Sequence, residues 1–310
     1  MGVILYKEPK LKNSNIFCGW PGIGNIGINA IDNLRAVLKA QEFAEIEPWD
    51  FFVPRKVVIE SGLLKDLEFP SSRFYYQRIE NQSLIFFIGQ EQPAEGGIRY
   101  AEGQKAYQMA NLVLDVAEKF DCRIVYTSGA AVTQIHHTAR PRVWAVPNDE
   151  SLIDEIKKYE NTVLMSGIEG GGSQGTITGL NGLLLGAAKK RRLKAVCLMG
   201  EIPYYLQGTP WPYPKASKSV LEVLAKILGI RLDLGQLDEL AEKIEENIEE
   251  LLENLYKAEV IPPQVKDEIE KLRYARPTEL GPITDEEQKK IMEHIDELFK
   301  EGDRKDERHL

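Results

Sequence analysis

A glycine-rich turn between a short apolar run and an amphipathic helix limits the folds open to this chain more than any other feature. The apolar run covers 16–18, and the helix expected after the turn covers 26–38. Between them, Gly22, Gly24 and Gly27 fit the spacing G-x-G-x-x-G, in which bare backbone holds a pyrophosphate at a helix N-terminus. The same turn begins Gly-Trp-Pro-Gly, which that pattern does not require. The role of this turn decides between a cofactor enzyme and a protein that binds other proteins.

Up to about residue 232, runs typical of strands alternate with runs typical of helices. Several of the strand runs are continuously apolar, as expected where helices cover both faces of a sheet. The expected strands are 16–18, 57–60, 74–79, 84–89, 122–128, 142–145, 162–166 and 195–199, and the expected helices are 26–38, 101–120, 152–159, 182–191 and 216–228. This alternation predicts an α/β sandwich with a mostly parallel sheet. Consecutive strands between 57 and 89 indicate that the sheet is mixed.

The chain changes character after residue 232. Residues 1–232 hold 27 basic and 24 acidic side chains, whereas residues 233–310 hold 12 basic and 24 acidic ones. We therefore expect an α/β core domain over 1–232 and an acidic helical C-terminal extension over 233–310. Within the extension, short helices are expected at 264–274 and 284–299, and the charged end is expected to be disordered.

The extension begins with one long amphipathic helix. Its apolar side chains recur every three or four residues and form a narrow seam, which suits a partner helix. The seam residues are Leu237, Leu240, Ala241, Ile244, Ile248, Leu251 and Leu255. We predict that the protein is a homo-oligomer with contacts through Leu237, Leu240, Ile244, Ile248, Leu251 and Leu255. The alternative is a helix that packs on its own core.

Several classes of protein are excluded by composition. No run of 18 apolar residues is present, so no transmembrane helix is expected, and the N-terminus lacks the pattern of a signal peptide. Cys18, Cys122 and Cys197 are far apart and have neither disulfide nor metal-site spacing. The acidic extension repels nucleic acid. We therefore expect a cytoplasmic protein that binds neither membranes nor nucleic acid.

The dinucleotide interpretation also requires an acidic residue at the end of the next strand, about 20 residues further on. Glu45 and Glu47 stand near that distance, but 41–47 is not a convincing buried strand and Pro48 ends it. A second glycine cluster, 170–179, lacks the Gly-Lys-Ser/Thr ending of a phosphate loop. We therefore expect no cofactor. The glycines of the first turn instead let its helix pack close to the sheet.

Two carboxylates follow apolar runs directly, at strand ends where open α/β sheets place their ligands. Glu91 and Glu201 either share a site there or cap loops. The candidate pocket consists of these carboxylates with residues of the first turn and of a later helix start: Gly22, Gly24, Asn25, Glu91, Asn181 and Glu201.

His136 and His137, with Arg140 and Arg142 nearby, are the other group that suggests chemistry. No cysteine or carboxylate stands at metal-ligand spacing beside the pair, and no Gly-x-Ser-x-Gly nucleophile elbow occurs in the sequence. We therefore predict no metal site, no catalytic residue and no enzymatic activity.

Taken together, several modest motifs occur in the order found in one known family. They are GWPGIGNIG at 19–27, QEQP at 90–93, YTSGAA at 126–131, PRVW at 141–144, GLNGLLLG at 179–186, CLMGEIP at 197–203, PKASKSVL at 214–221 and LGI at 228–230. Over about residues 13–255 the chain resembles the proteasome assembly chaperone family. Each motif is modest, but all of them in order are specific.

The resemblance implies a three-layer α/β/α fold similar to nucleoside phosphorylases, without their catalytic residues. It also implies homo- or hetero-oligomers that bind proteasome α subunits or a paralogous chaperone. Family members that dock on α-rings often end in a hydrophobic residue, Tyr and any residue. This chain ends Arg308-His309-Leu310, so docking through its own tail is not expected.

Three functions follow from these observations. The first is a proteasome assembly chaperone-like, oligomeric scaffold. The second is a small-molecule protein, binding or hydrolysing nucleoside-like ligands in the candidate pocket. The third is a protein-binding module unrelated to proteasomes that acts partly through the acidic extension.

Overall fold

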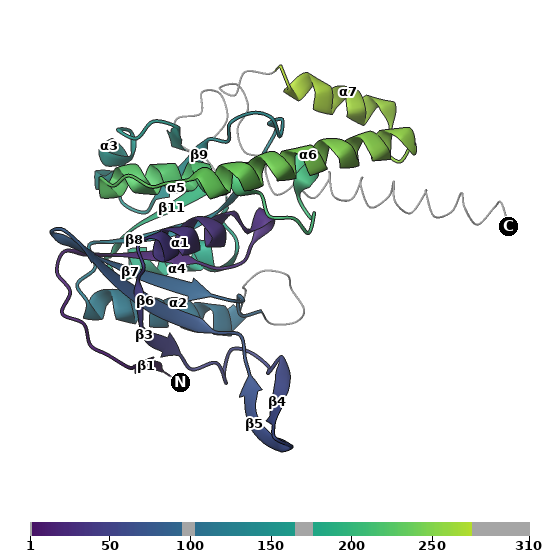
Figure 1. Ribbon diagram of the computed structural model, residues 1–310. Coiled ribbons are helices and arrows are strands. Elements are labelled where there is room, and N and C mark those ends of the chain that lie inside the picture. The colour runs from purple at the N-terminus through teal and green to yellow at the C-terminus, as the bar shows by residue number, and fades with distance from the viewer. Residues whose placement is uncertain (1, 95–102, 165–175, 275–310) are drawn as a thin grey trace.

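The computed structural model describes residues 2–94, 103–164 and 176–274, with a nine-stranded mixed sheet at the centre (Figure 1). The strands lie in the order β1-β3-β6-β7-β2-β8-β11-β9-β10. Their bounds are β1 Val3–Leu5, β2 Ser14–Gly19, β3 Gln41–Ile46, β6 Ser72–Ile79, β7 Gln82–Gly89, β8 Ile124–Thr133, β9 Val143–Pro147, β10 Thr162–Leu164 and β11 Lys194–Pro203. A separate two-stranded sheet is formed by β4 (Lys56–Glu60) and β5 (Leu63–Glu68).

The predicted α/β sandwich with a mixed sheet is confirmed. Strands β7, β2, β8 and β11 form a parallel centre, and every residue of β2 is buried. Within the described residues, four strand pairs of the large sheet are parallel and four are antiparallel. The prediction of a mostly parallel sheet therefore holds for its centre and for the edge pair β9–β10, whereas β11–β9 and the pairs from β7 to β1 are antiparallel.

Helices cover both faces of the sheet. They are α1 (Ile26–Val37), α2 (Gly103–Lys119), α3 (Ile153–Ile156), α4 (Gly179–Lys190), α5 (Pro214–Leu228), α6 (Gly235–Lys257) and α7 (Pro263–Leu272). Two hydrophobic clusters separate the faces, one beneath α2 and α4 and one beneath α1 and α5. Neighbouring residues of β11 alternate between them, since Cys197 packs in the first cluster and Leu198 in the second.

Strand β3 corrects the sequence prediction, which rejected 41–47 as a strand. It pairs antiparallel with β1 and β6 and lies near the edge of the sheet. Phe43, Ala44 and Ile46 are buried while Glu42 stays partly exposed beside Arg73. A register shift between Glu42 and Ala44 breaks the simple alternation of apolar and polar residues, so the pattern was missed.

Other expected elements differ at their ends. The helix expected over 182–191 begins at Gly179, and the one expected over 152–159 is α-helical only over Ile153–Ile156. The strand expected over 57–60 is β4, which is not part of the large sheet. The end of the strand expected over 162–166, part of the second glycine cluster, the helix expected over 284–299 and the charged tail lie outside the described residues.

The long predicted helix is α6, and it packs against its own core. Leu237, Ile244 and Ile248 are buried in the same cluster as the inner side chains of α5. Leu240 is 40% exposed, and Leu251 and Leu255 are half-buried. The alternative, in which the helix packs on its own core, therefore holds for Leu237, Ile244 and Ile248. Contacts between subunits through this helix stay a prediction.

Across the described ranges, no helix combines the length and the apolar character needed to cross a membrane.

Candidate functional site

The glycine-rich turn places α1 directly against the centre of the sheet. Gly24 has a φ of 57° and Asn25 a φ of 49°, so both adopt the left-handed conformation that glycine and asparagine tolerate best. A Cβ atom added to Gly27 would lie 2.1 Å from the carbonyl oxygen of Ser128 in β8. The third glycine of the motif therefore permits close contact between a helix and a strand.

The opposite face of β8 is also in close contact with the first turn of α4. A Cβ atom on Gly129 would lie 2.6 Å from the amide nitrogen of Asn181. The side chain of Gln92 links this turn to the glycine turn: its Nε2 donates to the Pro21 carbonyl at 2.7 Å, and its Oε1 accepts from the Leu180 amide at 3.2 Å. Two candidate regions predicted from sequence thus meet across one strand.

Glu201 lies in β11 with no exposed surface. Arg142 donates to it from Nη2 at 2.7 Å and from its backbone amide at 2.8 Å, and the indole Nε1 of Trp144 donates at 2.9 Å. Arg142 and Trp144 stand at the start of β9, the antiparallel neighbour of β11. A buried carboxylate with these donors is held as a structural ion pair.

Glu91 has a different environment. Its side chain is 45% exposed and accepts hydrogen bonds from Arg55 Nε at 2.8 Å and Nη2 at 2.5 Å. Strands β2 and β8 lie between its strand, β7, and the strand of Glu201. The structure therefore links the turn that holds Gly22, Gly24 and Asn25 to the helix start at Asn181 only through Gln92 and β8, and it pairs Glu91 and Glu201 with different arginines.

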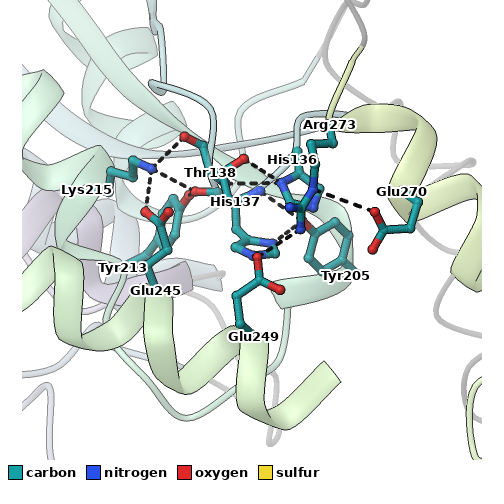
Figure 2. A network of polar contacts seen from close by, with 10 residues as sticks. All are labelled: His136, His137, Thr138, Tyr205, Tyr213, Lys215, Glu245, Glu249, Glu270 and Arg273. Atoms are coloured by element: carbon teal, nitrogen blue, oxygen red, sulfur yellow. Dashed lines mark hydrogen bonds and ion pairs between the residues drawn. The ribbon is translucent and has the colours of Figure 1, made fainter. Parts of the chain in front are cut away.

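A polar network of ionisable residues lies between the core and the C-terminal helices (Figure 2). Its centre is His136 and His137, each only 1% exposed, in the segment after β8. Tyr205 joins them: its hydroxyl accepts from the His137 backbone amide at 2.9 Å and lies 2.8 Å from His137 Nδ1. On the other side of the ring, His137 Nε2 lies 2.9 Å from Glu249 Oε1 of α6, although the angle falls short of a good hydrogen bond.

Lysine and arginine side chains extend this network to both C-terminal helices. Lys215 of α5 donates to the carbonyls of His137 and Thr138 and to Glu245 of α6, the last at 2.6 Å. Arg273, just after α7, donates to Glu249 at 3.0 Å. The network therefore links α6 to the core and the end of α7 to α6, as the dashed lines in Figure 2 show.

The chemistry of the network suits a structural role. Burial, together with the neighbouring His137, lowers the pKa of His136 to about 4. Burial also lowers the pKa of His137, although Glu249 opposes this effect. Both imidazoles are thus neutral near pH 7, and Tyr205 and Thr138 occupy their Nδ1 atoms.

The sequence pointed to His136 and His137 but not to their partners. Arg140 and Arg142, which stand near them in sequence, pair instead with Glu222 and Glu201. The partners from α6, Glu245 and Glu249, are four residues apart on the side of the helix next to its apolar seam. The four-residue spacing could have revealed these partners from sequence. Acidic residues beside the buried apolar seam of a helix face the same part of the protein as the seam does.

Acid is expected to destabilise this protein through the two buried histidines. Because their pKa values are lower in the folded than in the unfolded chain, the unfolded chain binds protons first as the pH falls below about 6.5. Each histidine that stays neutral in the folded state removes up to about 1.4 kcal/mol of stability per pH unit in this range. Urea unfolding between pH 7 and 5.5 measures the slope.

The matched variant is His136→Asn, which has no titrating group at this position. Its unfolding free energy should depend less on pH over the same range than that of the parent protein. An equal slope in the two proteins would contradict a role for His136.

The chain is similar to known proteins over most of its length. The model of the PAC2 family matches residues 16–252, which is more than half of the chain. Uncharacterized protein MJ1210 of Methanocaldococcus jannaschii is 29% identical over 272 residues, covering 86% of this chain and 93% of the relative.

Solved structures of similar proteins agree with this match. Pyrococcus furiosus PbaB, an archaeal proteasome activator, is 29% identical, with a TM-score of 0.66 over 80% of this chain and 97% of that chain. Pyrococcus furiosus PbaA, an archaeal homolog of proteasome-assembly chaperone, is 24% identical, with a TM-score of 0.58 over 83% and 99% of the two chains, and so supports the fold. The motifs that carried the resemblance all lie within the matched residues, and the chain belongs to the PAC2 family.

Proposed function

We propose that this protein is a proteasome assembly chaperone-like scaffold that forms homo-oligomers and holds protein surfaces without turning over a substrate. The observation that carries the proposal is the similarity to PbaB, an archaeal proteasome activator, along nearly the whole of that chain. Glu201 is buried and bonded to internal donors, and internal hydroxyls engage the Nδ1 atoms of His136 and His137, which supports a binding role over an acid–base one.

The partner we propose is a proteasome α subunit or a paralogous chaperone, contacted mainly by the acidic extension. One face of α6 packs on the core, and the opposite face carries four exposed acidic residues that have no ion pair among the described residues: Glu239, Glu242, Glu246 and Glu250. A row of this kind attracts a basic surface. Such attraction weakens as salt rises, since exposed charges are screened over about 8 Å at physiological ionic strength.

Binding to purified α subunits from the same organism, at low and at high salt, tests this proposal. Changing Glu239, Glu242, Glu246 and Glu250 together to Gln should weaken binding at low salt and reduce its salt dependence. The matched control removes four exposed acidic charges elsewhere, as Asp50→Asn, Glu80→Gln, Asp121→Asn and Glu150→Gln. That control should bind like the parent protein.

Two results would overturn parts of the proposal. Tight, salt-insensitive binding that disappears when residues 301–310 are removed would assign docking to the tail. No binding to any proteasome subunit, even with a cell lysate supplying partners, would favour a protein-binding module unrelated to proteasomes.

A further inference from the structure

The β4–β5 hairpin projects from the body of the molecule beyond the β1 side of the sheet (Figure 1). At its base, the Trp49 ring packs on Phe69 with centroids 4.6 Å apart, yet Trp49 remains 63% exposed. Arg55 ties the same end to Glu91. The hairpin is therefore fixed at its base and open to solvent along its length.

The two faces of this hairpin differ in character. Lys56 stands opposite Glu68, and their side chains form an ion pair of 2.9 Å, while Lys65 pairs with Glu60. The pairing register, with its shift between Val58 and Ile59, places Val57, Ile59, Leu64 and Leu67 together on the other face. The first face, called the charged face below, thus carries two ion pairs besides Val58 and Leu63, and the other face is apolar.

The apolar face is largely exposed. Ile59 is 69% exposed, Leu64 70% and Val57 53%, and Val53 just before β4 is 81% exposed. A two-stranded hairpin is at best marginally stable alone in water, and contiguous exposed apolar patches mark interaction sites. This face therefore requires a covering surface.

The net charge of the hairpin indicates which kind of surface can cover its apolar face. Residues 55–68 hold three basic and three acidic side chains, so the hairpin is neutral, whereas the whole chain carries a net charge of −9. A neutral apolar face has no charge with which to select an oppositely charged partner. It is also where two copies of an acidic chain can approach without repelling each other.

We propose that the apolar face of the β4–β5 hairpin is the self-association surface and that its occupant is the same face of a second copy of this chain. This inference rests on the oligomeric scaffold proposed above and names its contact. It differs from the contact predicted from sequence, because Leu237, Ile244 and Ile248 of α6 are already buried within their own chain. Two copies of the acidic α6 would moreover repel each other.

The test substitutes a cross-strand pair on the apolar face. Ile59 and Leu64 are directly opposite each other, so Ile59→Lys with Leu64→Glu replaces an apolar pair by an ion pair and keeps the hairpin. Light scattering after size exclusion should give an oligomer for the parent chain and the mass of a single chain for this variant. Circular dichroism should show the same fold in both.

Two controls separate this surface from others. Lys56→Glu with Glu68→Lys exchanges an ion pair on the charged face and should leave the oligomer intact. Leu240→Glu alters the exposed seam residue of α6 and should also leave it intact. A further variant, Ile59→Cys, should form a disulfide-linked dimer on mild oxidation, since Cys18, Cys122 and Cys197 are buried.

The outcomes distinguish this inference from the function on which it rests. A monomeric parent chain overturns both. An oligomer that survives the Ile59 and Leu64 substitutions, or that dissociates only with Leu240→Glu, overturns this inference alone. A variant that keeps its mass but no longer binds α subunits would make the hairpin a proteasome contact, and this also overturns the inference.

Discussion

Replacing Gly27 with alanine is expected to lower the free energy of unfolding by about 3 kcal/mol, the upper range for overpacking a close contact. The new Cβ atom would lie 2.1 Å from the carbonyl oxygen of Ser128 and 2.5 Å from its carbonyl carbon. Both atoms belong to the backbone of the central strand β8, so no side chain can rotate away. Helix α1 must therefore move outward and loosen the cluster around Ile31 and Leu34. Urea unfolding followed by circular dichroism measures the loss.

Two other glycines provide matched controls. Gly22→Ala should be nearly neutral, because its φ of −162° is ordinary extended backbone and no described atom lies within 4 Å of the added Cβ. Gly186→Ala, on the exposed side of α4, should stabilise the protein by up to about 1 kcal/mol, since alanine favours helix. If Gly27→Ala behaved like either control, the close contact of α1 with β8 would be wrong.

Replacing Glu201 with alanine is expected to cost about 3 kcal/mol, the lower range for breaking a buried ion pair. The carboxylate has no exposed surface, and the side chain of Arg142 is only 14% exposed. Removing the carboxylate leaves the guanidinium and the Trp144 indole N–H without their buried acceptor. The same urea experiment measures the effect.

An exposed ion pair is the control for this prediction. Glu222→Ala removes the partner of Arg140, whose side chain is 66% exposed, and should cost less than about 1 kcal/mol. The double variant Glu201→Leu with Arg142→Met should recover much of the stability, because apolar groups can replace a buried pair. Equal losses for Glu201→Ala and Glu222→Ala would show that burial does not strengthen the first pair.

The centre of the fold was predictable because its residues face apolar surroundings on both sides. The sequence of strand β2 contains an apolar run because α1 and α2 cover the two faces of the sheet around this strand. Strand β3 was missed because one of its sides is half-open and its register shifts after Glu42. The regular spacing of apolar residues in a sequence indicates which side chains are buried. This signal becomes weak where burial is incomplete.

The candidate site was predicted in parts but not assembled. Glu201 and Arg142 were both named from sequence, yet nothing local indicates that β9 lies antiparallel beside β11 and brings them together. Similarly, Glu249 reaches His137 only because α6 folds back along α5, more than a hundred residues further along the chain. Pairings of this kind depend on topology, which spacing alone does not encode.

The position of α6 and α7 has a consequence for how this molecule moves near charged objects. Thirteen acidic and five basic residues stand between positions 233 and 274, while the neutral hairpin lies at the other end of the molecule (Figure 1). Such a separation gives the protein a permanent electric dipole moment. A field from a basic surface exerts a torque on this dipole before contact and turns the C-terminal helices toward that surface. Orientation is thus set during diffusion, and the hairpin end points away from that surface, so the contact between copies is not blocked.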